Sequence, residues 1–314
     1  MLLILRASLR RPMVGTMRYF RYLILLPWLA GSPSLASAKS APMVLAPASS
    51  WNAYYAEDYC RLSRSFGSDK QQIALVIDRF APGDSFRLML AGQPMALVAP
   101  KGTANIRFGP ALPEQRLDFL SGTVGKDIPA WVFGQSNRIR PDDVAETERK
   151  KQEDYTLAPI TDAEVATITE IAIGRPLRNP VVLATGPMAA ALAALDACTD
   201  ELLTHWGIDV ARHKEISRPV APVDSPANWL KSSDYPREML AKLQPGLVQV
   251  RLIVGADGIP TACHIQQSTD AKGFDDAVCG GMMRRARFDP ALDKDGKPIM
   301  SYYVNLVRFQ PSGS

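Results

Sequence analysis

The chain has 314 residues, long enough for two ordinary domains, and with 46% hydrophobic and 22% charged residues it is neither a disordered nor a fibrous protein. Its formal net charge is +4, but residues 1–38 hold five arginines, no lysine and no acidic residue. From Lys39 onward, 36 − 5 = 31 basic residues face 32 acidic ones, and this net charge of −1 gives no support for nucleic acid as a partner.

The first 38 residues have the pattern of a secretory signal peptide. Arginines precede the apolar run 22–30, and small residues follow it up to Ala36-Ser37-Ala38. We therefore expect export and cleavage before Lys39. The alternative is an uncleaved anchor in the inner membrane, but a spanning helix needs about 20 apolar residues. Pro27, Gly31, Pro33 and three serines interrupt the stretch that such a helix would need.

Four cysteines, an even number in an exported chain, predict two disulfides, because an oxidising compartment favours cystine. Four cysteines permit three pairings, and the sequence alone does not select one. Because two lie in each half of the chain, the economical pairing is Cys60–Cys198 with Cys263–Cys279.

Between residues 51 and 206, short apolar runs separated by Gly, Pro, Asp and Asn predict a mostly-β region, either an antiparallel sheet or a partly closed barrel. The predicted strands span 73–77, 86–90, 95–98, 116–120, 130–133 and 180–184. The strongly charged stretch 137–155 is interpreted as a solvent-exposed loop.

Two helices are predicted in the same region. Thr161-Asp-Ala-Glu164 fits a capping box at the start of a short helix. A longer helix is predicted from Met188 to Trp206, because apolar residues recur three or four apart on one face: Met188, Leu192, Leu195, Cys198, Leu202 and Trp206. Cys198 is thus expected to point inward.

Periodicity is lost between Ile208 and Ser232, where Pro219, Pro222 and Pro226 occur. We interpret 208–231 as a proline-containing linker. It would join a β-rich N-terminal domain, 39–207, to a C-terminal domain, 232–314.

Periodicity in the C-terminal domain predicts the order helix, strand, strand, helix, strand. The first helix, 237–243, follows Tyr235-Pro236, because proline is tolerated in a first turn. Asp257-Gly258 supplies the positive-φ turn of a hairpin. The first strand of that hairpin places Val248, Val250, Leu252 and Val254 on one face, and the return strand is expected to place Ile259, Thr261, Cys263 and Ile265 together.

The second helix, 274–286, is amphipathic: Phe274, Val278, Cys279, Met282, Met283 and Ala286 fill one half of the helical wheel. Cys263 and Cys279 are therefore expected to meet where this helix packs on the sheet. A bridge closing about 15 residues contributes roughly 3 kcal/mol in the chain-entropy model. The last predicted strand is 301–309.

An ordered series of motifs in residues 232–309 resembles the TonB C-terminal domain. The series is Tyr235-Pro236, the alternating strand from Gly246 to Val254, Asp257-Gly258-x-Pro260, Ser268-Thr269, Phe274-Asp275, Arg287-Phe288-x-Pro290-Ala291, Gly296-x-Pro298 and Val307-x-Phe309. Each motif alone is common, but the full series in order is specific. We take Tyr235, Pro236, Gly258, Phe288 and Pro290 as the family motif positions. Cys263 and Cys279 are not part of the general family pattern.

The resemblance implies an α+β fold, with two helices packed on a three-stranded antiparallel sheet, preceded here by the mostly-β N-terminal domain. It also implies a periplasmic protein-binding module and not an enzyme. In TonB proteins an extended segment of an outer-membrane transporter adds as a strand to the exposed sheet edge. The corresponding edge here is Tyr302, Tyr303, Val304, Asn305, Leu306, Val307, Arg308 and Phe309.

We therefore expect an envelope protein as partner, with a TonB-dependent outer-membrane transporter as the first candidate and a homodimer through the same edge as an alternative. No cofactor and no metal are expected. A transducing TonB also needs a membrane anchor and a long spacer. Here the N-terminus is predicted to be cleaved, and a spacer of about 25 residues reaches ~80 Å only when fully extended. The sequence does not support energy coupling.

The remaining alternatives are a structural, self-associating envelope protein and a periplasmic enzyme with its site in the N-terminal domain. Gly122–Lys126 lacks the spacing of a phosphate-binding loop, and neither H-E-x-x-H nor C-x-x-C occurs. The three histidines, His205, His213 and His264, have few partners in the sequence that could activate them. Asp58, beside Cys60, is interpreted as a turn residue.

Overall fold

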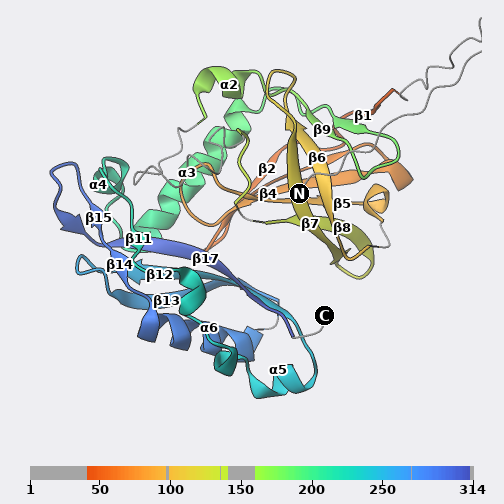
Figure 1. The fold of residues 1–314 in the computed structure, drawn as a ribbon. Helices are drawn as coiled ribbons and strands as arrows, with labels where there is room; N and C mark the ends of the chain where they lie inside the picture. The colour runs from red at the N-terminus through yellow and green to blue at the C-terminus, as the bar shows by residue number, and fades with distance from the viewer. Residues whose placement is uncertain (1–40, 97–98, 135, 141–159, 270, 312–314) are drawn as a thin grey trace, which may run out of the picture. The chain divides into compact units, whose positions relative to one another are not determined.

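The computed structural model describes residues 41–96, 99–134, 136–140, 160–269 and 271–311 (Figure 1). The described residues form one compact unit. The predicted signal peptide and its cleavage site lie outside the described residues, as does most of the charged stretch 137–155. In the described ranges, no helix has the length and apolar character required to cross a membrane.

In the described N-terminal region, ten strands form one sheet. Every neighbouring pair is antiparallel except β1 with β10. In spatial order the strands are β1 (Met43–Leu45), β10 (Val181–Leu183), β9 (Ile171–Ile173), β6 (Lys101–Phe108), β7 (Gln115–Val124), β8 (Ile128–Phe133), β5 (Arg87–Ala91), β4 (Ile73–Arg79), β3 (Cys60–Phe66) and β2 (Asn52–Tyr55).

One predicted strand, 95–98, is wrong in the part that the structure describes. Met95 ends a 3-10 helix, Gln93–Met95, that contains Pro94, and Ala96 belongs to no strand. Proline lacks the N–H that a central strand requires, so the chain turns here. Residues 97 and 98 lie outside the described residues. The other predicted strands overlap β4, β5, β7, β8 and β10.

The core of this region is made of apolar side chains from the strands of the sheet together with those of helix α3 (Ala189–His205). Of the apolar face predicted for this helix, Met188, Leu192, Leu195, Cys198 and Leu202 are buried, and Trp206 is partly buried against the same core. Helix α2 (Asp162–Ala166) begins with the predicted capping box, in which Thr161 and Glu164 bond to each other's backbone N–H.

Residues 208–231 carry short elements packed on the C-terminal domain. Helix α4 (Val210–Lys214) is followed by β11 (Ala221–Pro222), which pairs with β14 (Phe288–Asp289). The 3-10 helices Pro226–Asn228 and Ser232–Asp234 come next. The domain boundaries given above stay predictions.

The C-terminal domain contains an antiparallel sheet in which β12 (Gly246–Val254) lies between β13 (Pro260–Ser268) and β17 (Ser301–Phe309). Helix α5 (Arg237–Ala241) precedes the sheet, and α6 (Ala271–Arg285) packs on one face (Figure 1). The small strands β15 (Ala291–Leu292) and β16 (Pro298–Ile299) pair with each other before β17. The predicted α+β fold and its element order are confirmed.

Strand β13 departs from the predicted alternation. Ala262 pairs with Ile253, but Pro260 pairs with Val254, so Thr261 is an extra residue on this strand. Such a bulge resets the alternation of side chains. Ile259 is consequently 44% exposed, whereas Cys263 and Ile265 pack on the core beneath α6 as predicted.

Candidate protein-binding site

Three of the family motif positions, Tyr235, Gly258 and Phe288, lie at close contacts inside the C-terminal domain. Gly258 has a φ of 76°, and a Cβ atom there would lie 1.9 Å from the carbonyl oxygen of Phe288. Phe288 packs against Trp229 and Tyr303, and its N–H donates to the Gly258 carbonyl at 3.0 Å. Tyr235 packs edge-on against two rings of the same core, Phe274 and Phe309. These residues hold the sheet and helices in place.

The candidate binding edge belongs to β17. This strand pairs with β12 along one edge, and none of the strands in the described ranges pairs with its other edge. The N–H of Leu306 donates to the side-chain oxygen of Asn305 at 2.9 Å, so it points away from β12. Alternate residues of an antiparallel strand direct their backbone groups to the same edge. Val304, Leu306 and Arg308 therefore point N–H and C=O groups toward the free edge.

A groove of about 560 Å³ runs along the second half of this edge. Its apolar wall includes Leu230 and Met282, and its charged side chains are Lys231 and Arg308, with no carboxylate among the lining residues. The complete lining is Pro226, Ala227, Leu230, Lys231, Ser232, Tyr235, Leu240, Met282, Asn305, Leu306, Val307, Arg308, Phe309 and Gln310. The groove therefore combines an unpaired strand edge, an apolar wall and positive charge.

Comparison with known protein families bears on this part of the chain. Residues 231–311 match the family model described as Gram-negative bacterial TonB protein C-terminal. The chain carries a TonB C-terminal domain. The match spans about a quarter of the chain, and it includes β17, the groove-lining Lys231 and all five family motif positions. No curated protein matches the chain.

The face of the TonB C-terminal sheet that lies away from α6 is also covered. Arg251 points to this face, and its Nη1 lies 2.9 Å from Oδ1 of Asp58 in the turn between β2 and β3. The guanidinium carbon lies 4.1 Å from the ring centre of Trp206, at the end of α3. Burial lowers the pKa of Arg251, whereas Asp58 acts in the opposite direction. This contact joins the N-terminal region to the centre of the TonB C-terminal domain.

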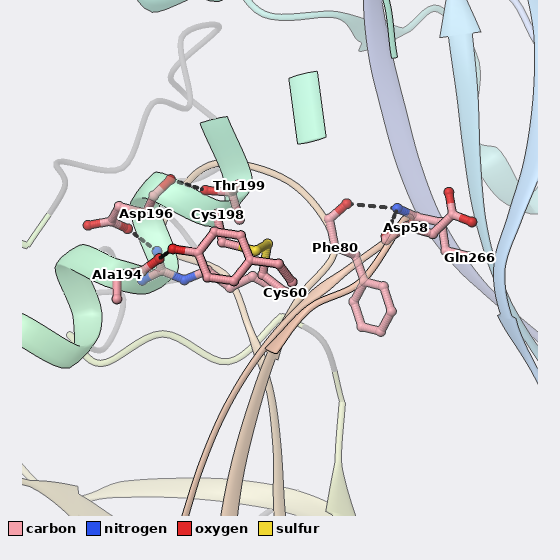
Figure 2. Close-up of a disulfide and its surroundings, with 10 residues drawn as sticks. Asp58, Cys60, Phe80, Ala194, Asp196, Cys198, Thr199 and Gln266 are labelled. Carbon is pink, nitrogen blue, oxygen red and sulfur yellow. Dashed lines mark hydrogen bonds and ion pairs between the residues drawn. A yellow bond between two sulfur atoms is a disulfide. The ribbon is translucent and has the colours of Figure 1, made fainter. Parts of the chain in front are cut away.

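A second contact uses Gln266, whose Nε2 donates to the carbonyl oxygens of Asp58 and Phe80, both at 2.8 Å (Figure 2). Gln266 is an extra residue on β13, because Gln267 pairs with Gln249 while Ile265 pairs with Val250. A bulge can redirect a side chain, and here the bulged residue reaches the N-terminal region. Asp58 is a turn residue, as interpreted, but its docking role was missed in the sequence.

The Asp58 turn is itself tied to α3 (Figure 2). Cys60 of β3 and Cys198 of α3 form a disulfide, with 5.9 Å between their Cα atoms. Close by, Arg79 pairs with Asp196, and the Tyr55 hydroxyl donates to the carbonyl of Ala194 at 3.1 Å. Helix α3 therefore holds in place the surface that docks on the TonB C-terminal sheet.

The second cysteine pair, Cys263 and Cys279, joins β13 to α6 with 5.6 Å between the Cα atoms. Both cysteine pairs fit disulfide bonds, in the economical pairing. Among the described residues, no group of three or more His, Cys, Asp and Glu is placed to hold a metal ion.

The three histidines do not come together into one constellation. His264 lies on the docked face of the sheet, opposite Arg251, and much of its side chain is exposed. Partial loss of solvent around its ring lowers its pKa, and the charge of Arg251 adds to this effect. His205 lines a pocket of about 540 Å³ that also contains Cys198, Glu201, Trp206, Arg251 and His264. His213 lies elsewhere, in α4, with its Nε2 atom 2.9 Å from Oγ of Ser301.

Proposed function

We propose that this chain is a periplasmic protein whose TonB C-terminal domain binds an extended segment of another envelope protein, which adds as a strand to β17. The observation that carries the proposal is the free β17 edge lining a groove. Strand addition obtains affinity from backbone hydrogen bonds and selectivity from pockets for alternate side chains. Val304, Leu306 and Arg308 supply the backbone groups, and the groove supplies the pocket.

The groove defines the chemistry of the segment that fits it. Side chains of an added strand alternate between the two faces of the sheet. Those facing Leu230 and Met282 meet apolar surface, and a carboxylate in reach of Lys231 or Arg308 meets positive charge without a competing acidic residue in the groove. The segment is therefore extended, partly apolar and acidic. Its first candidate source is a TonB-dependent outer-membrane transporter, which links the protein to transport across the outer membrane.

The proposed role is binding rather than catalysis, and it does not include energy coupling. Residues 208–231 include a helix and a strand folded against the C-terminal domain instead of forming an extended spacer. A folded segment does not span the distance that a transducing protein has to cross.

In-cell photo-crosslinking from single positions tests the proposal on the full-length chain. A photoreactive side chain at Arg308 is expected to capture an envelope protein, whereas the same group at the exposed Gln267 of β13, the opposite sheet edge, is not. Capture only of a second copy of this chain would instead favour self-association. Capture from Gln267 alone would overturn the assignment to β17.

A backbone substitution sharpens the test. Val304→Pro removes an N–H that points to the free edge and is expected to abolish partner capture, because proline cannot donate to an added strand. Val304→Thr keeps that N–H and a β-branched side chain, so it is the matched control and should retain capture. Equal capture by both variants would contradict strand addition at this edge.

Fractionation tests the location. A soluble periplasmic form beginning at Lys39 is expected. A full-length form that stays in the membrane after carbonate extraction would contradict cleavage.

A further inference from the structure

We propose that helix α4 covers the start of the free β17 edge, so that an added strand can pair with β17 only from Val304 onward. This inference rests on the strand-addition function proposed above and concerns where pairing begins. It assigns a specificity role to residues outside the matched family region, which begins at residue 231.

The position of the His213 ring carries the argument. Its Nε2 atom lies 2.9 Å from Oγ of Ser301, and the ring stacks on Tyr302 with 5.2 Å between centres and 25° between planes. Side chains of consecutive strand residues point to opposite faces of a sheet. A ring that contacts both Ser301 and Tyr302 therefore lies beside the strand. Because β12 occupies the other edge, His213 lies at the start of the free one.

The side chain of Tyr302 also packs against residues at the end of α3. Trp206 meets it edge-on with 5.2 Å between ring centres, and Leu203, Ile208 and Ile253 form a buried cluster against it. Burial raises the pKa of the Tyr302 hydroxyl well above its usual value. The end of α3 and the start of α4 thus close around the first residues of β17.

Helix α4 is held in place on both sides, so it can block an added strand from the first residues of β17. Asp209 caps the helix by accepting the N–H of Arg212 at 3.0 Å. The Arg212 side chain reaches Oδ2 of Asp293 at 2.5 Å, and this hydrogen bond lowers the pKa of that carboxyl. Lys214 pairs with Asp200 of α3 at 2.5 Å. The helix is therefore held between α3 and the segment that leads into β17.

The groove supports the same limit independently. Its β17 lining begins at Asn305 and continues to Phe309, and residues 301–304 do not line it. Of the residues that direct backbone groups to the free edge, Tyr302 stacks on the His213 ring, whereas Leu306 and Arg308 line the groove and Val304 lies between them. A partner segment consequently pairs with about five residues of β17, each of which adds ~3.4 Å to the length of the paired strand.

A tethered strand tests this limit in the full chain. We would append a flexible Gly-Ser linker and a nine-residue segment of alternating Glu and Val after Ser314, and record cross-strand nuclear Overhauser contacts by NMR. Contacts are expected at Val304, Leu306 and Arg308 and not at Tyr302. The variant His213→Ala is expected to extend the contacts to Tyr302, whereas His264→Ala, on β13 at the opposite edge of the sheet, should leave them unchanged.

The outcomes separate the two proposals. Contacts that reach Tyr302 in the chain with His213, or contacts that stay unchanged in His213→Ala, would overturn the role of α4 while leaving strand addition intact. A complete lack of contacts along β17 in every variant would remove strand addition itself, and this inference with it.

Discussion

On one face of the C-terminal sheet, Val248, Val250, Leu252 and Val254 pack against apolar side chains of α6, such as Phe274. On the other face, Gln249, Arg251 and Gln266 are just as buried, but they are polar, and the N-terminal region covers Arg251 and Gln266. Apolar burial is non-directional and is satisfied by any well-shaped surface. Polar burial is favourable only when particular partner groups stand at hydrogen-bonding distance.

The difference indicates what each face contributes. The α6 face supplies most of the stability of the C-terminal fold, because the side chains that it buries are mainly apolar. On the docked face, Arg251 Nε, Gln249 Nε2 and Gln266 Oε1 have no hydrogen-bond partner among the described residues. A buried ion pair contributes little net stability, but loss of one partner is costly. The docked face therefore contributes more to the orientation of the N-terminal region on the sheet than to the stability of the chain.

The largest expected effect comes from the two disulfides, one associated with each face. Cys263–Cys279 connects the sheet to α6 across a separation of 16 residues, and Cys60–Cys198 braces the docking turn across a separation of 138. In the chain-entropy model, removing the disulfide that closes the longer loop lowers the free energy of unfolding by about 5 kcal/mol, and removing the other lowers it by about 3 kcal/mol. Urea unfolding of the two double-alanine variants is expected to give this order. The reverse order would show that α6 depends on its disulfide more than the docked face does.

The next effect concerns the charge at the centre of the docked face. Asp58→Ala leaves the buried guanidinium of Arg251 without its carboxylate, and we expect a loss of about 2–3 kcal/mol, typical of hydrogen bonds to charged groups. The double variant Asp58→Ala with Arg251→Met removes the unpaired charge and should recover most of that loss. Thermal unfolding of the two single variants and the double variant measures the coupling.

An exposed ion pair provides the control for this cycle. Lys294 and Glu215 lie 3.1 Å apart with side chains 65% and 61% exposed. Glu215→Ala is expected to change stability by no more than about 1 kcal/mol, since exposed pairs are weak. If Asp58→Ala costs no more than Glu215→Ala, the docked face is not a buried electrostatic contact.

The two faces also differ in how far the sequence predicts them. The apolar periodicity of β12 and α6, the Asp257-Gly258 turn and the ordered motifs were sufficient for the element order and for the TonB C-terminal domain. They were sufficient because these features depend on neighbours along the chain.

The docked face could not be predicted in the same way. Gln249 and Arg251 alternate with apolar residues, which is the pattern of a solvent-facing strand side. Asp58 and Arg251 lie 193 residues apart, and no local pattern relates them. The two bulges of β13 were also missed, because the residue that each inserts, Thr261 or Gln266, resembles any other polar strand residue. The free β17 edge was predicted from the resemblance, but its partial cover by α4 was not.

A smaller effect is expected from Gln266. Gln266→Ala removes two hydrogen bonds to backbone carbonyls of the N-terminal region and should cost about 1–2 kcal/mol at the usual net value per bond. Gln267→Ala, at the exposed neighbouring position, is the matched control and should cost less than about 0.5 kcal/mol. Hydrogen exchange of the Asp58 turn, measured by mass spectrometry, should increase in Gln266→Ala only. Equal exchange in both variants would mean that Gln266 does not hold the turn.

The smallest expected effect is the response to pH at the start of β17. Burial lowers the pKa of His213, whose ring faces Ser301 and Tyr302, while its neighbours Arg212 and Lys214 are paired with Asp293 and Asp200. Because the folded-state pKa lies below the value of about 6.5 in the unfolded chain, the unfolded chain binds more protons between those two values. Stability is then complete above pH ~6.5 and decreases as the pH falls through that window.

His213→Gln keeps a hydrogen-bonding group near Ser301 but does not titrate, so its stability should fall less than that of the native chain between pH 7 and pH 5. The pKa of His264 is also lowered, and His264→Gln therefore serves as the parallel control on the docked face. If only His264→Gln flattens the profile, the acid sensitivity belongs to the docked face. If only His213→Gln does, the acid sensitivity belongs to the α4 cover over β17, and mild acid should lengthen the edge that is open to a partner strand.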